Sequence, residues 1–232
     1  MCVSRAVAEE LHAGWGIRAT VIPNGVDAAR FTRAASSSPA AAARRREWRR
    51  RLGGGPLVLT VGGVEPRKGS LELLEAFALL RRRWPAARLA VAGGETLLDY
   101  RDYRARFDAR CAEPGQEGVV LGPVADPELP ALVAADAFAP PSAKEGFGLA
   151  AMEALAAGVP LVLSDRPVFR EVYCGCAQFA GTVEELGEAL DCAVAGRDPE
   201  RRRRGEALAA SHTWAAAAAH VALYERLLSR RT

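Results

Sequence analysis

Two glutamates, Glu145 and Glu153, flank seven residues in the stretch Glu-Gly-Phe-Gly-Leu-Ala-Ala-Met-Glu. Two carboxylates can act as a catalytic pair on a glycosidic bond, but they must then face each other across that bond. Here the first belongs to a glycine-rich turn and the second to a helix, roughly 7 to 8 Å further along the helix axis. We therefore interpret them as acceptors for hydroxyl groups on different parts of one ligand. The spacing alone has little specificity, because surface glutamates are common on helices.

The elements around these glutamates place them at the edge of a predicted sheet. An apolar run, residues 135–142, ends in prolines and is typical of a buried strand that leaves its sheet. Gly146 and Gly148 allow the backbone to approach a ligand closely. A helix is predicted to begin near Gly148, because apolar residues recur at helical spacing at Leu149, Met152, Leu155 and Ala156. A helix start without a side-chain cap offers free N–H groups and a positive dipole end, which suit a phosphate.

A second loop, residues 62–70, has the sequence Gly-Gly-Val-Glu-Pro-Arg-Lys-Gly-Ser and combines glycines with two cations. Arg67 and Lys68 offer charge-assisted donors, and the helix predicted after Gly69 points its positive end at the same place. The order Lys-Gly-Ser excludes a nucleotide-triphosphate P-loop, and no dinucleotide Gly-x-Gly-x-x-Gly is present. The loop therefore suits a ligand rich in phosphate, with a charged loop that only caps a helix as the alternative.

Short β-rich runs alternate with helical patterns from residue 56 onward, and this alternation predicts an α/β fold, a doubly wound parallel sheet of the Rossmann-like type. The predicted strands are residues 56–63, 88–92, 119–121, 137–139, 161–163 and 177–179. The first helix is predicted over 70–84. A long C-terminal helix is predicted over 206–228, with Trp214, Val221, Tyr224 and Leu228 as its apolar anchors.

The first 55 residues follow a different pattern. Val7 and Leu11 indicate a short helix, residues 19–22 a short strand, and residues 23–27, Pro-Asn-Gly-Val-Asp, a turn. The low-complexity stretch 33–43 predicts a mobile connection or the start of a frayed helix.

Composition and charge exclude several classes of protein. The 232 residues carry a net charge of +3, and the arginine runs lie in separate segments with only 6% aromatic residues, which argues against a nucleic-acid partner. No apolar run is long enough for a membrane span, and the start lacks a signal-peptide core, so we expect a cytoplasmic protein with possible peripheral contact at the inner membrane face through its arginines. The five cysteines are odd in number and scattered, and no metal site is predicted.

The motifs together resemble those of retaining glycosyltransferases with the GT-B fold, specifically family four (glycosyl transferases group 1). The resemblance rests on the stretch 145–165, on the Glu-Pro-Arg-Lys loop, and on Ser4-Arg5 with the later run 22–31, Ile-Pro-Asn-Gly-Val-Asp-x3-Phe. It implies that residues 1–32 are a remnant of the N-terminal acceptor domain, 33–55 a linker, 56–205 the donor-binding Rossmann-like domain and 206–232 the C-terminal helix. A fragment, a start assigned too late and a naturally reduced protein are three explanations of this layout, of which a fragment is our expectation.

The resemblance also implies roles for individual residues. Arg67 and Lys68 match the cations that hold the diphosphate of the donor, while Gly63 stands where many members have arginine and has a steric role only. Val124 matches a loop that offers main-chain hydrogen bonds to the nucleobase. The remaining matches are Glu145 to sugar hydroxyls, Glu153 to the ribose diol, and the backbone around Phe147, Gly148 and Leu149 to sugar and phosphate.

These matches predict an enzyme that moves a hexose from a nucleoside diphosphate sugar to an acceptor, with retention of configuration and no metal or other cofactor. The catalytic residues are predicted to be Glu145, Arg67 and Lys68. The acceptor, a saccharide, a lipid or a small molecule, is left open, and so are the sugar and the nucleotide. The chain alone is expected to be inactive or nearly so, because most of the acceptor half is absent. The alternatives are a non-catalytic nucleotide-sugar binding module and a sugar-nucleotide epimerase with the same fold.

Overall fold

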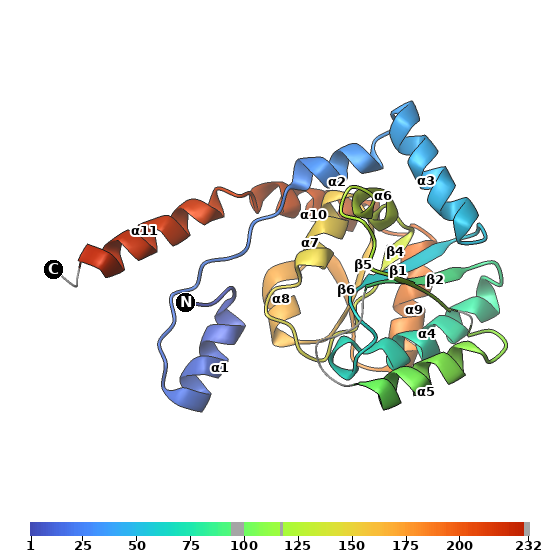
Figure 1. The fold of residues 1–232 in the computed structure, drawn as a ribbon, viewed down its shortest axis with the longest axis horizontal. Coiled ribbons are helices and arrows are strands. Elements are labelled where there is room, and N and C mark those ends of the chain that lie inside the picture. Colours follow the sequence, from blue (N-terminus) through green and yellow to red (C-terminus); the bar gives the residue numbers. More distant parts are fainter. Residues whose placement is uncertain (94–99, 117, 230–232) are drawn as a thin grey trace.

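A single parallel sheet organises the chain (Figure 1). The structure is a computed structural model that describes residues 1–93, 100–116 and 118–229. Within these residues six strands pair in the order β3-β2-β1-β4-β5-β6. Their bounds are β1 Leu57–Val61, β2 Arg88–Ala92, β3 Gly118–Gly122, β4 Ala137–Phe138, β5 Leu161–Ser164 and β6 Ala177–Ala180. The predicted strands are confirmed, and all the pairings are parallel.

Helices cover both faces of this sheet, as the doubly wound prediction requires (Figure 1). One face carries α4 Ser70–Arg83, α5 Arg101–Cys111 and α9 Val183–Val194. The other carries α2 Ala28–Ala35, α3 Pro39–Arg51, α6 Leu129–Val133, α7 Leu149–Ala156, α8 Pro167–Tyr173 and α10 Pro199–Ser211. Along β1, Leu57 and Leu59 enter one core and Val58 the other, because successive strand residues point to opposite faces. The α/β fold class is thus confirmed.

The central pairing, between β1 and β4, is short and is fixed at its start by Asp136. The Asp136 carboxylate accepts a hydrogen bond from the Leu57 N–H at 2.7 Å and two from Arg49 of α3, each at 2.7 Å. At its other end β4 stops after Phe138, and Pro140 and Pro141 follow within three residues. Proline has no N–H to donate, so the pairing cannot continue there and the chain turns away from the sheet.

The predicted single C-terminal helix is wrong, because the chain forms α10 and then a separate helix, α11 Ala216–Ser229. The break between α10 and α11 lies where the segment 24–27 contacts residues 212 and 213. The Val26 N–H donates to the His212 carbonyl at 2.8 Å, an oxygen that a continuous helix would use for itself. Gly25 lies so close that a Cβ there would stand 2.3 Å from the Thr213 carbonyl oxygen.

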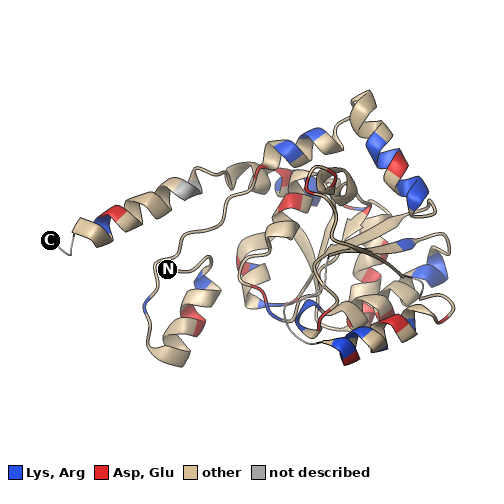
Figure 2. Ribbon diagram, viewed as in Figure 1, with Lys and Arg blue, Asp and Glu red and all other residues tan. Residues whose placement is uncertain are grey.

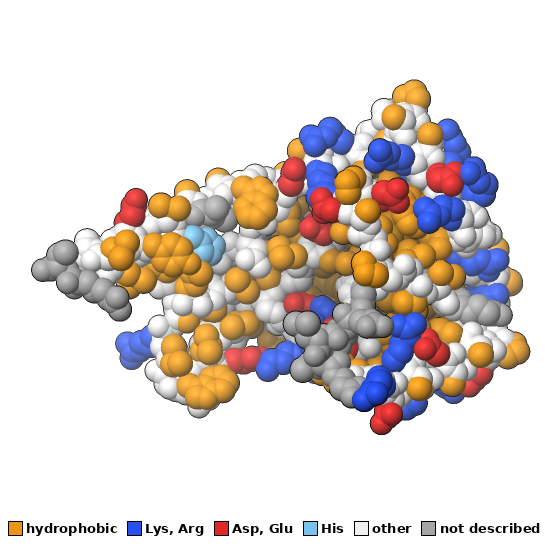
Figure 3. All heavy atoms as spheres, in the orientation of Figure 1, with side chains coloured by type: hydrophobic (Ala, Val, Ile, Leu, Met, Phe, Trp, Pro, Cys, Tyr) orange, Lys and Arg blue, Asp and Glu red, His pale blue; other side chains and the backbone are white. Residues whose placement is uncertain are grey.

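The predicted anchors of that helix are exposed. Trp214 is 66% exposed, and Val221, Tyr224 and Leu228 are more than half exposed. Figures 1 and 3 show α11 extending away from the body of the molecule, with hydrophobic side chains along it. Alanine propensity and apolar spacing were sufficient to predict a helix but not its packing.

For the first 55 residues, one expectation is confirmed in part and one needs correction. A helix does start within residues 33–43: they form the end of α2 and the start of α3, where Ser38 accepts a hydrogen bond from the Ala41 N–H and Pro39 occupies the first turn. Residues 19–22 contribute only an isolated bridge between Val21 and Cys2 rather than a strand. The short helix around Val7 is confirmed as α1 Arg5–Trp15.

Charge is distributed unevenly over these elements (Figure 2). Six arginines lie within α3, and several line the outer side of that helix in Figure 3.

No helix of the described residues is both long enough and apolar enough to cross a membrane.

The first prediction concerns Gly69, between the short 3-10 helix η1 Pro66–Lys68 and α4. Gly69 has φ 65°, and a Cβ there would lie 2.2 Å from the Pro141 carbonyl oxygen. Gly69→Ala should therefore lower the free energy of unfolding by at least about 2 kcal/mol, through both backbone strain and a backbone clash.

Gly16→Ala is the matched control, because Gly16 has φ 66° and a Cβ there would meet nothing within 4 Å. It should cost only the strain of the left-handed conformation, about 1 kcal/mol. Urea denaturation of both variants measures the difference. Equal losses would show that contact with the loop after β4 is not what requires a glycine at this position.

Candidate functional site

The strand order reverses between β1 and β4, and the candidate site lies at that reversal. The chain continues from β1 to β2 on one side and from β4 to β5 on the other, so the loops after β1 and β4 diverge. In open parallel sheets, such a divergence leaves a crevice at the carboxyl ends of the strands where ligands bind. The two motifs predicted from sequence, residues 62–70 and 145–153, follow these two strands.

An ion pair joins the two motifs across the crevice. Lys68 Nζ donates to Glu145 Oε2 at 2.8 Å, and the two side chains are 19% and 22% exposed. The aliphatic stem of Lys68 packs over Gly62, where a Cβ would lie 3.3 Å from Lys68 Cε. Because Gly62 has no side chain, it leaves space for the Lys68 side chain, whereas the sequence analysis singled out Gly63. Gly63 lies in the loop between β1 and η1 and is partly exposed.

A cavity of about 330 Å³ surrounds this ion pair. Its walls come from the ends of β1 and β4, from the start of α7, from α8 and from the N-terminal segment. The lining residues are Val3, Asn24, Val61, Lys68, Pro140, Glu145, Gly146, Phe147, Gly148, Leu149, Ala150, Ala151 and Phe169. Of the predicted site residues, the structure thus brings five together here: Lys68, Glu145, Phe147, Gly148 and Leu149.

The start of α7 forms one wall of the cavity and carries unpaired donors. Gly148 precedes the helix in the left-handed region, with φ 91°, and no side chain caps it. The Leu149 and Ala150 N–H groups have no hydrogen-bond partner among the described residues. The buried Tyr173 hydroxyl donates to the Gly148 carbonyl at 2.7 Å and fixes the turn. Burial raises the pKa of Tyr173, so it remains a donor at ordinary pH. This helix start can accept an anion.

Arg67 lies outside the cavity lining and already has a partner. Its guanidinium pairs with the Glu65 carboxylate at 2.7 Å, and the Glu65 side chain is only 5% exposed. The Arg67 side chain is half exposed, at the mouth of the loop. Its main-chain carbonyl accepts from the Ala143 N–H at 2.8 Å, so Arg67 also ties the loop after β1 to the loop after β4.

Glu153 lies on α7 beyond the cavity lining and is half-buried. None of the described residues forms a hydrogen bond or ion pair with its carboxylate. Burial raises the pKa of Glu153, the nearby Arg30 lowers it in part, and Asp126 raises it. Val124 lies two residues before Asp126 in the loop after β3, partly buried against the same core as α7. The loop after β3 thus brings Asp126, two residues beyond Val124, within electrostatic reach of Glu153.

Several contributors escaped the sequence interpretation. Asn24 lines the cavity from the Pro-Asn-Gly motif, and Arg30 and Asp126 form an ion pair near Glu153. The Tyr103 hydroxyl accepts from the Leu71 N–H at 3.1 Å and occupies a donor at the start of α4. Of these residues, only Asn24 could be identified from the sequence, because asparagine and glycine after proline are typical of an exposed turn.

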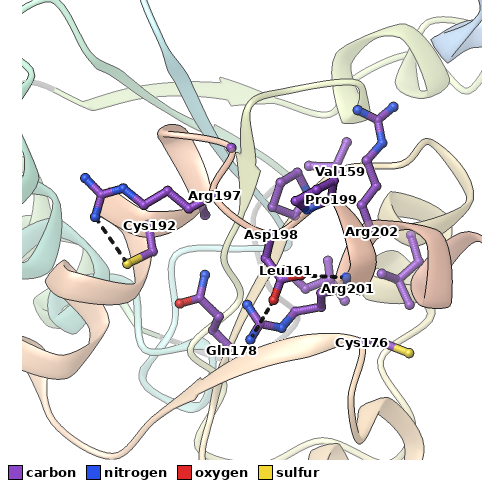
Figure 4. A pocket seen from close by; sticks show the side chains of 14 residues that line it. Val159, Leu161, Cys176, Gln178, Cys192, Arg197, Asp198, Pro199, Arg201 and Arg202 are labelled. Carbon is purple, nitrogen blue, oxygen red and sulfur yellow. Dashed lines mark hydrogen bonds and ion pairs between the residues drawn. The ribbon is translucent and has the colours of Figure 1, made fainter.

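A second cavity, of about 140 Å³, lies at the opposite edge of the sheet, beside the first residues of β5 and β6 (Figure 4). It has three arginines, but each is paired with an acid: Arg197 with Asp191 at 3.5 Å, Arg201 with Asp198 at 3.1 Å, and Arg202 with Glu206 at 3.1 Å. The cysteines that line it, Cys176 and Cys192, are free thiols. Each of these arginines thus has an acidic partner among the described residues.

Among the described residues, no group of three or more His, Cys, Asp or Glu side chains is arranged to hold a metal ion. The charged groups of the site are instead the cations Lys68, Arg67 and Arg30, each opposite a carboxylate.

The sequence matches one protein family and several curated proteins. The model of the family Glycosyl transferases group 1 matches residues 44–207. A glycogen synthase of Mycobacterium tuberculosis is 34% identical over 195 residues, which cover 80% of this chain and 43% of that protein. A D-inositol 3-phosphate glycosyltransferase of Nocardia farcinica is 31% identical over 219 residues, 89% of this chain and 47% of that protein. The chain spans about half the length of the curated relatives it matches.

The fold also recurs in solved structures. The chain superposes on Anabaena Alr3699/HepE, solved with UDP-glucose, with a TM-score of 0.81 and 22% identity, covering 98% of this chain and 63% of that one. A glycosyltransferase of Rickettsia africae gives a TM-score of 0.83 at 18% identity, covering 97% and 62%. At these identities the likeness shows a shared fold.

The environment of Glu153 leads to a stability prediction. Its folded pKa is raised, so the stability that protonation contributes is present at low pH and is lost as the pH rises through that folded pKa. Glu153→Gln should therefore raise the melting temperature at neutral pH, and this gain should shrink on acidification. Glu188→Gln, at an exposed position of α9, is the control and should change little. Thermal unfolding at about pH 7 and about pH 5 measures both. A destabilised Glu153→Gln at neutral pH would contradict this interpretation.

Proposed function

The chain belongs to the Glycosyl transferases group 1 family, and on this premise we propose that it forms the donor-binding part of a retaining hexosyltransferase. The donor is a nucleoside diphosphate sugar. The observation that carries this proposal is the cavity at the strand-order reversal, where Lys68 and the uncapped start of α7 face the same space. A lysine and free helix N–H groups together suit a diphosphate.

Each motif then contacts one part of the donor. Lys68 holds the diphosphate together with the N–H groups of Leu149 and Ala150. Glu145 accepts hydroxyl groups of the sugar, and its pairing with Lys68 sets its orientation before the donor arrives. Because an ammonium has three donors, Lys68 can keep Glu145 and still contact a phosphate oxygen. Phe147 and Gly148 shape the turn between them.

The nucleoside lies toward the other end of the site. Glu153 accepts hydrogen bonds from the two ribose hydroxyl groups, for which its carboxylate must be ionised. Val124 offers main-chain groups to the base. Arg67 supports the diphosphate from the mouth of the loop, provided that it exchanges its contact with Glu65 in part for the ligand. Gly63 leaves space for this movement.

The chemistry that these groups support is electrostatic. When the bond between the sugar and the diphosphate breaks, negative charge develops on the departing diphosphate. Lys68, Arg67 and the positive end of α7 stabilise that charge, as oxyanion-stabilising donors do in other enzymes. We propose that these cations take the place of a metal and that the configuration at the sugar carbon is retained.

The acceptor remains open to a saccharide, a lipid or a small molecule. The relatives carry names that span these classes, from glycogen synthase to phosphatidyl-myo-inositol mannosyltransferase. Since the chain spans about half the length of such relatives, we propose that the acceptor contacts lie outside it and that the isolated chain has little or no transferase activity. A cytoplasmic location, with peripheral contact at the inner membrane face, also stays a prediction.

Calorimetric binding of sugar nucleotides tests the site. Of UDP-glucose, GDP-mannose and ADP-glucose, the one that binds the chain most tightly is used. Lys68→Ala should lower the affinity for it by about tenfold or more, because a charge-assisted contact contributes about 1.5 to 3 kcal/mol. Glu153→Ala should weaken it further in the double variant. Lys144→Ala is the matched control, since Lys144 is the other lysine of the chain and is exposed outside the cavity.

Unchanged affinity in the Lys68 and Glu153 double variant would rule out this site. Binding without turnover by the complete protein, with an acceptor from each of the three classes supplied, would favour a non-catalytic binding module instead.

A further inference from the structure

We propose that Arg30 is a positioning residue for Glu153: its guanidinium, anchored by Asp126, favours the ionised Glu153 carboxylate that can accept the ribose hydroxyl groups of the donor. The inference rests on the proposed function and adds to it a residue outside the motifs that suggested that function. It also assigns a role in the donor site to α2, which precedes the sheet in the sequence.

Arg30 is held in place by the loop after β3. Its Nη2 lies 2.9 Å from Asp126 Oδ2, and the same nitrogen donates to the Asp126 carbonyl. The Arg30 side chain is 29% exposed, so most of its surface is covered by neighbours, whereas Asp126 is 80% exposed. Asp126 thus anchors the guanidinium from the solvent side.

Helix α2 lies directly against α7, the helix that carries Glu153. Thr32 Oγ1 donates to the carbonyl of Ala156 at 2.9 Å, and Ala156 follows Glu153 by less than one helical turn. Phe31, which is 2% exposed, packs into the same core as Met152. These contacts, at the two residues that follow Arg30, hold α2 against α7, and from there the charge of Arg30 acts on Glu153.

The charged and titratable groups around Glu153 come from three elements. Arg30 belongs to α2, Asp126 to the loop after β3 and Tyr173 to α8. Helix α6, also near α7, has no charged residue. On α10, Arg202 and Glu206 pair with each other beside Gly158, and His212, at the end of α10, packs against Phe147 before the start of α7. Arg30 is therefore the cation that acts on Glu153, and Asp126 opposes it.

The opposite charges of Arg30 and Asp126 allow an electrostatic role of Arg30 on Glu153 to be distinguished from a purely structural role in holding α2 on the loop. Burial raises the pKa of Glu153, Arg30 lowers it and Asp126 raises it. Removing Arg30 should shift the loss of donor binding to higher pH. Removing the Asp126 charge should shift it to lower pH. If the pair served only to hold α2 on the loop, both changes would break the same contact and act in the same direction.

The experiment measures the dissociation constant of a sugar nucleotide from about pH 5 to about pH 8. We would compare UDP-glucose, GDP-mannose and ADP-glucose and use the one that binds most tightly. Such diphosphate diesters carry no phosphate group that titrates in this range. The variants are Arg30→Gln, Arg30→Lys, Asp126→Asn and, as a control on the same helix, Arg33→Gln, at an exposed position.

Arg30→Gln should weaken binding about threefold to tenfold at low pH and less than twofold at high pH, since a charge effect on a titrating group disappears once the group is fully ionised. Arg30→Lys should restore most of the affinity, Asp126→Asn should improve binding at low pH, and Arg33→Gln should match the parent. Glu153→Gln should abolish the pH dependence itself.

Parallel shifts for Arg30→Gln and Asp126→Asn, or pH-independent weakening by both, would overturn the role of Arg30 and leave the donor site intact. A chain that binds none of the three sugar nucleotides would overturn both the donor site and this inference. Circular dichroism of each variant checks that the fold is kept.

Discussion

The short parallel pairing of β1 with β4 is the constraint on which the site depends. Four of the strand neighbours follow from ordinary crossover connections, but β1 and β4 are distant in sequence and meet over two residue pairs only. Asp136 fixes where they meet, by binding the Leu57 N–H and Arg49 of α3. Pro140 and Pro141 fix where they part. The crevice follows from the strand-order reversal, and the proline pair ends the β1–β4 pairing beside it.

In and around that crevice, three cations are each paired with an acid. Lys68 faces Glu145, Arg67 faces Glu65 and Arg30 faces Asp126. The Lys68 side chain is only 19% exposed, so an uncompensated charge there would be costly, and the Glu145 carboxylate makes it tolerable in the absence of ligand. The pairs also hold the cations at set places on three separate loops or helices. The donors that a diphosphate needs are then already in place, so its binding does not have to order these side chains, and less entropy is lost on binding.

The sequence predicted local features well and long-range ones poorly. Strand β2 was predicted with its bounds, and Lys68 and Glu145 were found because each follows a strand in a glycine-rich loop. The long C-terminal helix was wrong because the Val26 N–H takes the His212 carbonyl, and nothing near residue 212 signals a segment that arrives from residue 26. The pairs of Arg30 with Asp126 and Arg49 with Asp136 escaped for the same reason. Ser38-Pro39, by contrast, was a readable helix start within a stretch that composition alone suggested to be mobile.

Several groups near the site are in states that folding alone does not favour. Among the described residues, the half-buried Glu153 carboxylate, the Leu149 and Ala150 N–H groups and the fully buried Ser142 hydroxyl have no hydrogen-bond partner. The buried groups among them cost the folded chain some free energy. Such costs persist where a ligand offsets them, because the same unpaired groups become hydrogen-bonded when it binds. The unpaired donors and acceptor along α7 are therefore an independent reason to place the ligand at this helix rather than at the second cavity, where each arginine has an acidic partner.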